Sequence, residues 1–460
     1  MNNTLKSMLI AAAALTAVSS FAQDKSTLDL LVKKGVITAE ERAAALEESS
    51  NARAASGINR VFPKEDATKR LTISGYFQTQ FQNFASEYTN AITGVTTTLP
   101  SQSGFIMRRL YVELLADVGE GISGNLVMDI SGNTTSSASS WIDRAMLSYA
   151  GSYGSLDFGY RKVAWGYEES TLSSLFKASS SKLLTVERGI TNRYWNEAEN
   201  AKGRLGFGAH HVGLFYNSLI NPQGFEYGVA VTNGNRDFTS AGKGQNDLGV
   251  YANLVYNYKV SDSEKYAVGV NYGKNKFFDA ANFVNKNATM EGYNPFVQVQ
   301  YFNWTVMGEY MSTKLTDSLD GASRNHTPTG YNATAVYKIN DNWEGVARYT
   351  SLDTDGRGLN INAQERDYAT TTGSTGLYFN KSDALYVGLN YYFTLNALGS
   401  AVYGPNAKVQ LGFERANFND ALGTRNGTTG AVSSTALNAT VNKGEKATVD
   451  AIRLQAQVAF

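Results

Sequence analysis

The segment ATVDAIRLQAQVAF (447–460) alternates apolar and polar residues with a period of two. In an extended strand this spacing places Ile452 and Leu454 on one face and Arg453 and Gln455 on the other. A buried polar group without a partner costs roughly 2–7 kcal/mol, so the polar face has to meet water rather than a dry core. Such a strand is typical of a wall with lipid on one side and water on the other.

The same alternation recurs from Leu71 onward, for example over 248–257 and 385–393. It predicts an all-β fold, a transmembrane antiparallel β-barrel of 16 strands that a short N-terminal helical segment precedes. The strands are expected near 71–84, 105–118, 122–131, 140–150, 154–161, 203–217, 225–232, 247–258, 265–273, 293–302, 304–312, 329–338, 343–351, 385–394, 407–416 and 447–460.

The connections between these strands alternate in length, as a membrane barrel requires. Short connections at 117–121, 151–155 and 340–342 are expected on the periplasmic side. Long connections are expected on the outer side, at 85–104, 162–202, 233–246, 274–292, 313–328, 352–384 and 417–446. A barrel of this size encloses an aqueous channel, whereas one of about eight strands is filled by its own side chains.

The composition agrees with a barrel and excludes several other classes. The chain has 43 Gly, 27 Tyr and 22 Phe but only 6 Pro, and aromatic residues gather at the two rims of membrane barrels. It has 41 basic and 41 acidic residues, so no nucleic-acid-binding tail is expected. Because it has no cysteine, disulfides and thiolate metal sites are excluded.

The first residues predict export. Lys6 precedes an apolar run over 8–18, and Ser20 and Ala22 are small residues suited to a cleavage site before Gln23. Residues 1–22 are therefore expected to be a Sec signal peptide, too short in its apolar part to span a bilayer. After export and cleavage, the predicted location is the bacterial outer membrane.

Between the signal peptide and the barrel the period is helical. Over 23–50, leucine and valine share one face, and Lys and Glu occupy the other. A periplasmic coiled coil that helps to trimerise or anchor the barrel and a solvated helix without a partner both fit this pattern. Residues 51–69 are small and polar and are expected to be a linker, and 70–460 form the barrel.

The charged residues of the wall are the candidate site, because they would line the channel. Strand parity turns both signs of charge towards the lumen, where facing charges create a transverse field and set ion preference. Simple hydration and cross-strand pairing explain most of them equally well. The predicted lining residues on strands are Arg109, Glu113, Arg144, Arg161, Arg348, Lys408 and Arg453.

The connection 162–202 is the candidate constriction. Its length and its aromatic residues, Trp165 among them, suit a loop folded into the barrel rather than an ordinary surface loop. A short helix is expected around 171–184. The candidate constriction residues in this connection are Lys162, Lys177, Lys182, Glu187 and Arg188.

No catalytic, metal or cofactor site is predicted. His210 and His211 are adjacent, so on a strand they point to opposite faces and cannot share a metal, and His326 falls in a long connection. No nucleophile motif accompanies them. Phe460, an aromatic residue that ends an alternating strand, is the candidate signal for the barrel-assembly machinery, although a rim aromatic would look the same.

Several segments resemble the phosphate-selective porin O and P family. They are SGYFQTQFQNF (74–84), FIMRRLYVELLADVGEGISGNLVMDI (105–130), WIDRAMLSYAG (141–151), GSLDFGYRKVAWGYEESTLSS (154–174), LLTVERGITNRYW (183–195) and, before the barrel, LDLLVKKGVITAEE (28–41). The resemblance implies a homotrimeric channel of 16 strands with an inward third loop. It also implies phosphate transport, which needs a ladder of basic residues with few acids nearby. The chain departs from that requirement, since Arg108 and Arg109 are its only paired arginines in these segments and Glu113 shares a face with Arg109.

The sequence as a whole predicts an outer-membrane porin, a passive diffusion channel for small polar solutes and ions, with anions such as phosphate included. Its expected partners are those solutes, outer-membrane lipid, the barrel-assembly machinery and two further copies in a homotrimer. The alternative is a structural or adhesive barrel without significant transport, which a lumen plugged by loops would favour.

Overall fold

The computed structural model describes 33, 70–131, 142–166, 205–207, 210–233, 248–276, 289–316, 325–356, 358–360, 378–393, 407–425, 432–433 and 441–459. Of the chain before Arg70 only Lys33 is described, as helical, so the predicted signal peptide, helical segment and linker lie outside the described residues. Within the described ranges, no helix is long and apolar enough to cross a membrane.

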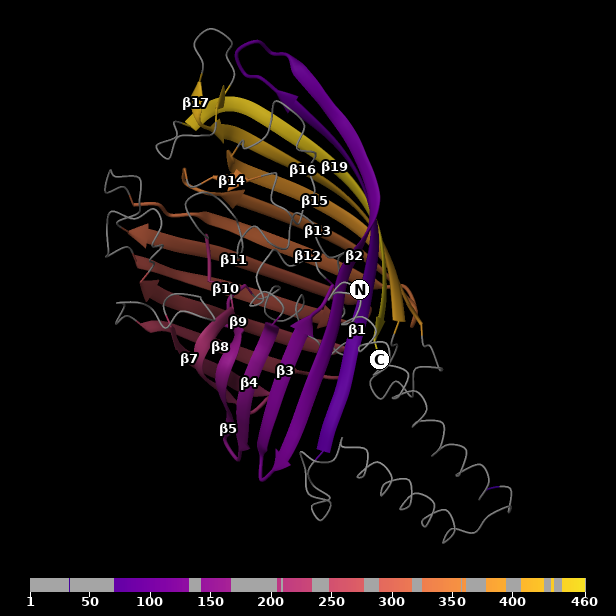
Figure 1. Cartoon of the computed structure of the whole chain (residues 1–460), viewed down its shortest axis with the longest axis vertical. Helices are drawn as coiled ribbons and strands as arrows, with labels where there is room; N and C mark the ends of the chain where they lie inside the picture. Colours follow the sequence, from indigo (N-terminus) through magenta and orange to yellow (C-terminus); the bar gives the residue numbers. More distant parts are fainter. Residues whose placement is uncertain are drawn as a thin grey trace, which may run out of the picture.

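The predicted antiparallel β-barrel of 16 strands is confirmed (Figure 1). Its wall consists of β1 (Arg70–Thr89), β2 (Thr96–Gly119), β3 (Ile122–Asp129), β4 (Ile142–Gly151), β5 (Gly154–Lys162), β6 (His210–Ser218), β7 (Gly224–Asn233), β8 (Leu248–Lys259), β9 (Glu264–Lys276), β10 (Thr289–Tyr301), β11 (Trp304–Thr316), β12 (Thr329–Lys338), β13 (Trp343–Asp353), β15 (Tyr378–Phe393), β16 (Ala407–Leu422) and β19 (Val441–Ala459). Three further strands have two residues each: β14 (Leu359–Asn360), which belongs to the same sheet and pairs with β15, and β17 (Thr424–Arg425) and β18 (Val432–Ser433), which form a separate hairpin.

The first and last strands close the barrel. β1 pairs with β2 on one side and with β19 on the other, in a register that runs from Tyr76 opposite Ala459 to Thr89 opposite Lys446. Closure leaves no open sheet edge along this seam, which is the condition for strands to cross a bilayer.

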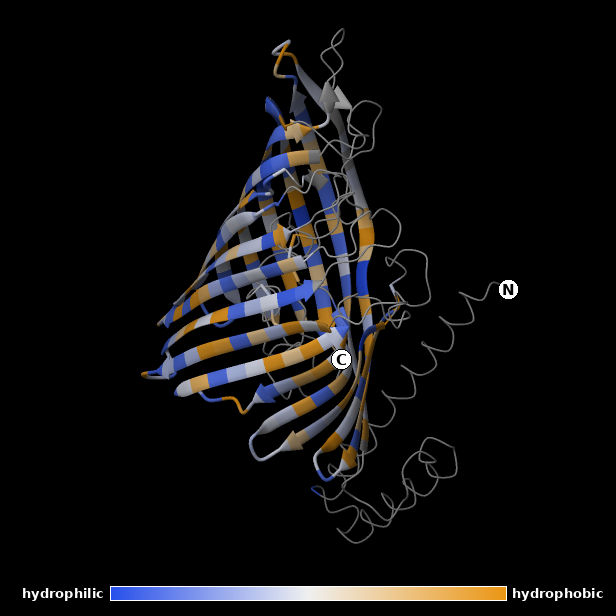
Figure 2. Cartoon of the chain, turned by 90° about the vertical axis from the view of Figure 1, so that its left-hand side faces the viewer, coloured by the Kyte–Doolittle hydropathy of each residue, from blue (hydrophilic) through white to orange (hydrophobic). Residues whose placement is uncertain are grey.

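Alternation along the strands separates two surfaces, and the hydropathy bands of Figure 2 follow it around the wall. On β15 the side chains of Leu385 and Val387 are 51% and 45% exposed, whereas Tyr386 between them is 1% exposed. The exposed set is the outer face, and the buried set points into the barrel. The predicted division into an apolar outer face and a polar inner face is therefore the observed one.

Aromatic residues form two bands on the outer face. On four strands, two outward-facing aromatic residues are six positions apart, and the outward-facing residues between them are small or aliphatic. This spacing separates the two bands by roughly 20 Å along the strand. The pairs are Tyr266 and Tyr272 on β9, Trp304 and Tyr310 on β11, Tyr331 and Tyr337 on β12, and Trp343 and Tyr349 on β13. Two aromatic girdles around an apolar belt are what a membrane-spanning barrel presents to lipid and its two interfaces.

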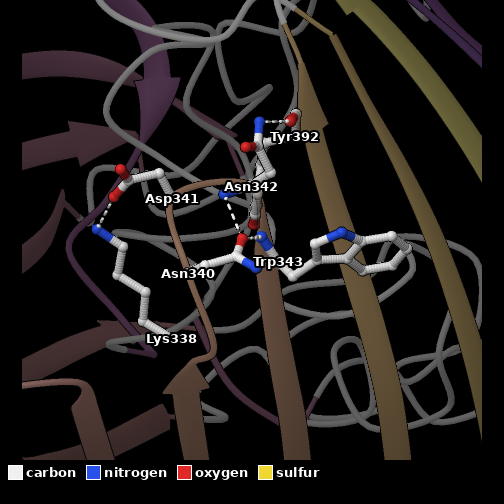
Figure 3. Close-up of polar contacts among 6 residues, drawn as sticks. All are labelled: Lys338, Asn340, Asp341, Asn342, Trp343 and Tyr392. Carbon is white, nitrogen blue, oxygen red and sulfur yellow. Dashed lines mark hydrogen bonds and ion pairs between the residues drawn. The ribbon is translucent and has the colours of Figure 1, made fainter.

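A tight turn joins β12 to β13 at one rim (Figure 3). The side-chain Oδ1 of Asn340 accepts hydrogen bonds from the backbone N–H groups of Asn342 (2.9 Å) and Trp343 (3.0 Å). Asn342 also ties the turn to the end of β15, because its Nδ2 donates to the carbonyl of Tyr392 at 2.8 Å. This Asx geometry explains why a few residues suffice between two long strands.

The same rim carries two lysine–aspartate pairs three residues apart. Lys338 lies 2.8 Å from Asp341 in the turn of Figure 3, and Lys259 lies 2.6 Å from Asp262 in the turn between β8 and β9. The hydrogen bond from Lys259 lowers the pKa of Asp262 below its ordinary value. Both pairs are solvent-exposed, so they add little stability.

The first outer connection differs from its prediction. The stretch 85–104 was expected to be a long loop, but β1 extends to Thr89 and β2 begins at Thr96. Asn90 closes the hairpin, because its Oδ1 accepts from the N–H groups of Ile92 and Thr93, and Gly94 takes a positive φ of 66°. The expected loop is therefore wrong: threonines, which suit extended backbone, continue the ladder past the apolar alternation.

Other outer connections are also shorter than expected, since strands extend beyond their apolar segment. β16 continues to Leu422 and β19 begins at Val441, although 417–446 was expected to be a loop. β6 is instead shorter than predicted, because it begins at His210 and not near residue 203. Residues 205–207 leave the wall and turn inward.

Candidate functional site

The lumen of the barrel is the candidate site, and a bulge shapes its first wall segment. Between Gln78 and Thr79 of β1, the paired residue on β2 jumps from Arg109 to Met107, so Arg108 is the extra residue of a β-bulge. Arg108 and Arg109 are both buried, and the Arg109 NH1 donates to Tyr76 Oη at 3.1 Å. Strand parity alone would have turned one of these two arginines outward.

The rest of this wall segment contains Glu113, whose carboxylate accepts hydrogen bonds from Ser74 Oγ at 3.4 Å and from Asn125 Nδ2. Glu113, Tyr111 and Arg109 occupy alternate positions of β2, which turns them to the same face. The Arg109 guanidinium lies 5.0 Å from the ring centroid of Tyr111, a cation–π contact that keeps it against the wall.

A second basic group lies on β4 and β5. Arg161 forms an ion pair with Asp157 and lies 5.2 Å from the ring centroid of Phe215 on β6. Arg144 is close enough for its charge to act on Arg161. Lys162 is the last residue of β5, where it faces His210 in register.

A third charged group lies on β13, β16 and β19. The Arg453 NH1 donates to Glu414 Oε2 at 2.9 Å, and these two side chains are 2% and 0% exposed. Arg348 on β13 donates from Nε to Thr334 Oγ1 at 3.0 Å, and its charge also interacts with Glu414. Lys408, on β16, is buried opposite Gln457.

The lumen-facing cations therefore gather on one arc of the barrel, from β13 through β16, β19 and β2 to β5. Across the lumen the wall differs. In the described part of β6 to β12, away from the rim turns, the inner face carries acids and amides but no lysine or arginine. This division was not apparent from the sequence, because it depends on which strands face one another.

Amide side chains link neighbouring strands in this second arc. Asn271 donates to Asn294 Oδ1 at 2.8 Å, and Asn294 donates to Glu309 Oε2 at 3.1 Å. Asn332 donates to the other oxygen of Glu309 at 3.1 Å. These four strands, β9 to β12, thus share one hydrogen-bonded row on the inner wall.

A second amide row crosses the basic arc. Gln455 donates to Gln410 Oε1 at 3.0 Å, and Gln410 donates to Asn390 Oδ1 at 2.9 Å. Asn390 donates to the hydroxyl of Tyr392 at 3.4 Å, and that hydroxyl donates to Glu344 Oε2 at 2.9 Å. Neither row was among the predicted site residues. Glutamine and asparagine at the polar positions of successive strands were the available signal.

Both ends of the connection between β5 and β6 turn into the barrel. Trp165 and Phe207 are 0% and 1% exposed and pack edge to face, with ring centroids 4.8 Å apart. The Thr313 hydroxyl, on the inner face of β11, donates to the carbonyl of Leu205 at 2.6 Å. A Cβ added at Gly273 of β9 would meet the Phe207 ring at 2.7 Å, so this glycine provides the seat for the ring.

Of the predicted constriction residues, the described part of the chain contains Lys162, at the end of β5. Trp165 and Leu205 place the two ends of the connection on the inner wall, as an inward loop requires. Lys177, Lys182, Glu187, Arg188 and the expected helix around 171–184 lie outside the described residues.

The histidines do not form a shared site. His210 Nε2 lies 3.5 Å from Asp143, His211 Nδ1 lies 3.4 Å from Thr232 Oγ1, and His326 Nδ1 lies 2.6 Å from the carbonyl of Asp355. Within the ranges that the structure describes, no group of three or more His, Asp or Glu side chains could hold a metal ion. Phe460 lies outside those ranges, one residue after Ala459, which pairs with Tyr76.

The closed barrel, its apolar outer belt and its aromatic girdles place the chain in the bacterial outer membrane. The polar side chains inside the barrel then border its lumen, whereas the outer face contacts lipid.

The chain matches no protein-family model and no curated protein sequence. The resemblance to the phosphate-selective porin O and P family is therefore not confirmed.

Solved structures similar to the chain include outer-membrane proteins and channels. An anion-selective porin from Comamonas acidovorans is 15% identical, with a TM-score of 0.48 over 85% of this chain and 100% of that one. The outer-membrane channel DcaP of Acinetobacter baumannii is 12% identical, with a TM-score of 0.48 over 86% of this chain and 99% of that one. OmpT, an outer membrane protein of Vibrio cholerae, is 12% identical, with a TM-score of 0.48 over 86% of this chain and 99% of that one. At this level of similarity the comparisons say nothing about the solute, and the barrel rests on the strand pairing described above.

Proposed function

We propose that the protein is a passive porin, through which small polar solutes and ions, anions such as phosphate among them, cross the outer membrane. The observation that carries this proposal is the closed barrel of 16 strands with a polar inner wall. Barrels of roughly this strand number enclose a water-filled channel, whereas small barrels are filled by side chains. The diffusion step needs no energy coupling.

The connection between β5 and β6 is the proposed constriction. Trp165 and Phe207 pack together, buried, at the two ends of this connection, which supports the proposal that it folds into the barrel. A loop in this place narrows the channel and sets a size limit. Lys177, Lys182, Glu187 and Arg188 are the proposed charged residues of this constriction.

Charge preference is proposed to arise from the two unlike arcs of the wall. The arc with Arg109, Arg161, Arg348, Lys408 and Arg453 also carries Glu113, Asp157, Glu344 and Glu414, and it faces an arc of amides with Glu309. The transverse field across the lumen is therefore weak. Because Arg453 and Arg161 each have an acidic partner, the field favours anions only weakly. Phosphate passes such a channel without being selected strongly.

Three copies are proposed to assemble through their lipid-facing surfaces, as the family resemblance implied. The barrel-assembly machinery is the proposed partner during insertion, with Phe460 as its recognition residue. Neither proposal is needed for a single barrel to conduct.

Solute flux into liposomes tests the proposal. Purified protein in liposomes should admit uncharged sugars at rates that fall steeply with solute size, because a narrow channel discriminates by size. Liposomes without protein and liposomes with heat-unfolded protein are the controls. Swelling no faster than in these controls, from a preparation whose barrel is folded, would favour the structural or adhesive alternative.

A further inference from the structure

A row of charged side chains crosses three neighbouring strands of the wall, β9, β10 and β11 (Figure 1). Lys274 on β9 is directly opposite Glu291 on β10, and Glu291 is directly opposite Lys314 on β11. The side chains of Lys274 and Glu291 are 54% and 48% exposed, and Lys314 is exposed as well. We call these three residues the lysine row.

The lysine row lies on the outer face of the barrel. Alternation along β11 turns Lys314 to the same side as Val306, which is 47% exposed. On β9, Lys274 follows Val270 at the same spacing, and this valine is 40% exposed. The row therefore continues the surface that contacts lipid and does not border the lumen.

An aromatic girdle lies directly below the row, towards the middle of the wall. Tyr272 is opposite Tyr293, and each is two positions from the charged residue of its own strand. The ring centroids of Tyr293 and Tyr310 are 6.3 Å apart. Two positions along a strand correspond to about 7 Å. Since tyrosines mark the boundary between hydrocarbon and water, the row lies at the level of the lipid headgroups.

The row belongs to the outer rim. β9 begins at Glu264 and β11 at Trp304, directly after short turns, whereas Lys274 and Lys314 lie near the opposite ends of these strands. In membrane barrels the short turns are periplasmic and the long connections face outwards. The row is thus level with the outer leaflet, whose characteristic lipids in a bacterial outer membrane are phosphorylated glycolipids.

Within the row, one cation has no acidic partner. Glu291 Oε2 lies 3.0 Å from Lys274 Nζ, and its Oε1 accepts a hydrogen bond from the Tyr272 hydroxyl at 2.8 Å. Lys314 forms no ion pair or hydrogen bond with any residue that the structure describes. The row therefore has two cations and one acid, and its unpaired ammonium group is exposed at the membrane surface.

The outer rim from β13 to β1 differs, because its outward charges are balanced. Lys381 lies 3.2 Å from Asp353, and Arg415 lies 2.6 Å from Asp450. This stretch also carries Lys446, Asp383 and Glu87. An anionic group of a lipid therefore gains more at the lysine row than at these pairs.

The spacing of the two lysines suits a phosphate group. Adjacent strands lie about 5 Å apart, so the backbones of β9 and β11 are separated by roughly 10 Å. The long side chains of Lys274 and Lys314 can converge over that distance. Lysine binds phosphate as a point charge and needs no fixed fork geometry, so flexible, exposed lysines are adequate ligands.

We propose that the lysine row binds a phosphate group of a phosphorylated glycolipid in the outer leaflet. Lys314 is the main contact, and Lys274 is the second. Glu291 limits the affinity, because it repels the phosphate and competes for Lys274. Acyl chains of the same lipid would lie against the valines below the girdle. This inference does not depend on conduction through the barrel.

Titration of the detergent-solubilised protein with diphosphorylated lipid A, followed by native mass spectrometry, tests the proposal. The wild type should bind lipid A saturably and more tightly than its dephosphorylated form. Lys314→Gln should weaken the apparent affinity about fivefold, and Lys274→Gln with Lys314→Gln about twentyfold, the effect expected for one and two lysines at an anionic lipid surface. Glu291→Gln should strengthen it about fivefold, a gain that damage to the fold cannot produce.

Lys381→Gln is the matched control, because it removes the same charge from an outward lysine on the same rim that is 50% exposed. Its lipid affinity should equal that of the wild type. Equal losses in Lys381→Gln and Lys314→Gln would overturn the site, since overall charge alone would then explain binding. Equal affinity for the dephosphorylated lipid would overturn it too, and displacement of lipid A by an equal concentration of inorganic phosphate would assign the row to free phosphate instead.

Single-channel current separates this inference from the proposed function. Lys314→Gln, Glu291→Gln and Lys381→Gln change the outer face alone, so their conductance should equal that of the wild type. Failure of the lipid site with normal conductance leaves the porin intact, and absence of conductance with normal lipid binding leaves the lipid site intact.

Discussion

At Glu414 one buried carboxylate pairs with one guanidinium group and acts through its charge on a second. It accepts from Arg453 NH1 at 2.9 Å, and its charge also acts on Arg348. A buried charge is tolerated only while its partner is present, because the unpaired charge then has neither water nor a counter-ion.

Glu414→Gln should therefore destabilise the barrel by about 3–5 kcal/mol, the usual cost of removing one partner of a buried pair. The measurement is the temperature at which the folded barrel changes its mobility on a denaturing gel. Adding Arg453→Gln to this variant should recover part of the loss. A single variant as stable as the wild type would show that the pair is solvated.

A substitution at Gly273 tests whether the Phe207 ring positions the β5–β6 connection. An added Cβ would lie 2.7 Å from the Phe207 ring, so Gly273→Ala should displace that ring and loosen one end of the β5–β6 connection. Single-channel recordings should show a larger or noisier conductance. Gly345→Ala is the control, because nothing lies within 4 Å of the added Cβ there. Identical recordings from both variants would mean that the seat of Phe207 does not position the loop.

Residue parity in the sequence places Arg348 and Arg453 on the inner face, and both side chains are buried in the structure. It could not reveal that Arg108 and Arg109 are both buried, because a bulge inserts a residue without any change in composition. Nor could it reveal which amides become neighbours. That depends on register between strands far apart in sequence, such as Gln80 opposite Gln455.

Among the elements, the β5–β6 connection determines most of the proposed transport. Its ends carry aromatic residues that pack on inner-wall glycines, so the connection is anchored at both ends. Its length and aromatic content predicted the inward direction, whereas its contacts with β9 and β11 appear only in the structure.

Replacing residues 167–204 by a short Gly-Ser link should raise the single-channel conductance several-fold and reduce the charge preference. The reason is that the proposed constriction and its charges are removed while the wall stays closed. Circular dichroism should confirm unchanged strand content. Conductance equal to that of the wild type would exclude this connection as the constriction.

The seam of β1 and β19 carries a prediction about assembly. Deleting Phe460 should reduce the amount of protein in the outer membrane without changing the register that precedes it, because Ala459 already pairs with Tyr76. Quantifying the protein in isolated outer membranes checks this. Phe460→Trp, which keeps an aromatic end, is the control, and equal amounts of the deletion variant would exclude the signal role.

The first hairpin shows where element prediction fails. Apolar alternation defines only the part of a strand that lies in lipid, so strands that continue into water are cut short in a prediction from hydropathy. The threonines at 96–98 extend β2 beyond the membrane belt without any apolar face. The two-residue strands β14, β17 and β18 were missed because two residues are too few to show an alternation.

For the whole molecule, the alternation predicted the correct number of wall strands, because each crossing of the membrane needs its own apolar face. The aromatic pairs six residues apart on β9, β11, β12 and β13 would have sharpened that prediction. Closure between β1 and β19 could not be read from the chain in the same way. Closure is a property of the whole sheet, because it pairs the first strand of the barrel, β1, with the last, β19.

The closed barrel is proposed to conduct ions across the outer membrane. Single-channel conductance of the purified protein in a planar bilayer tests this claim most directly, in KCl under a salt gradient and with phosphate added. We predict ohmic current in discrete steps, grouped in threes if the trimer forms, with a reversal potential that shows a weak preference for anions. A folded, heat-modifiable barrel that gives no current steps would contradict the claim and leave a structural or adhesive role.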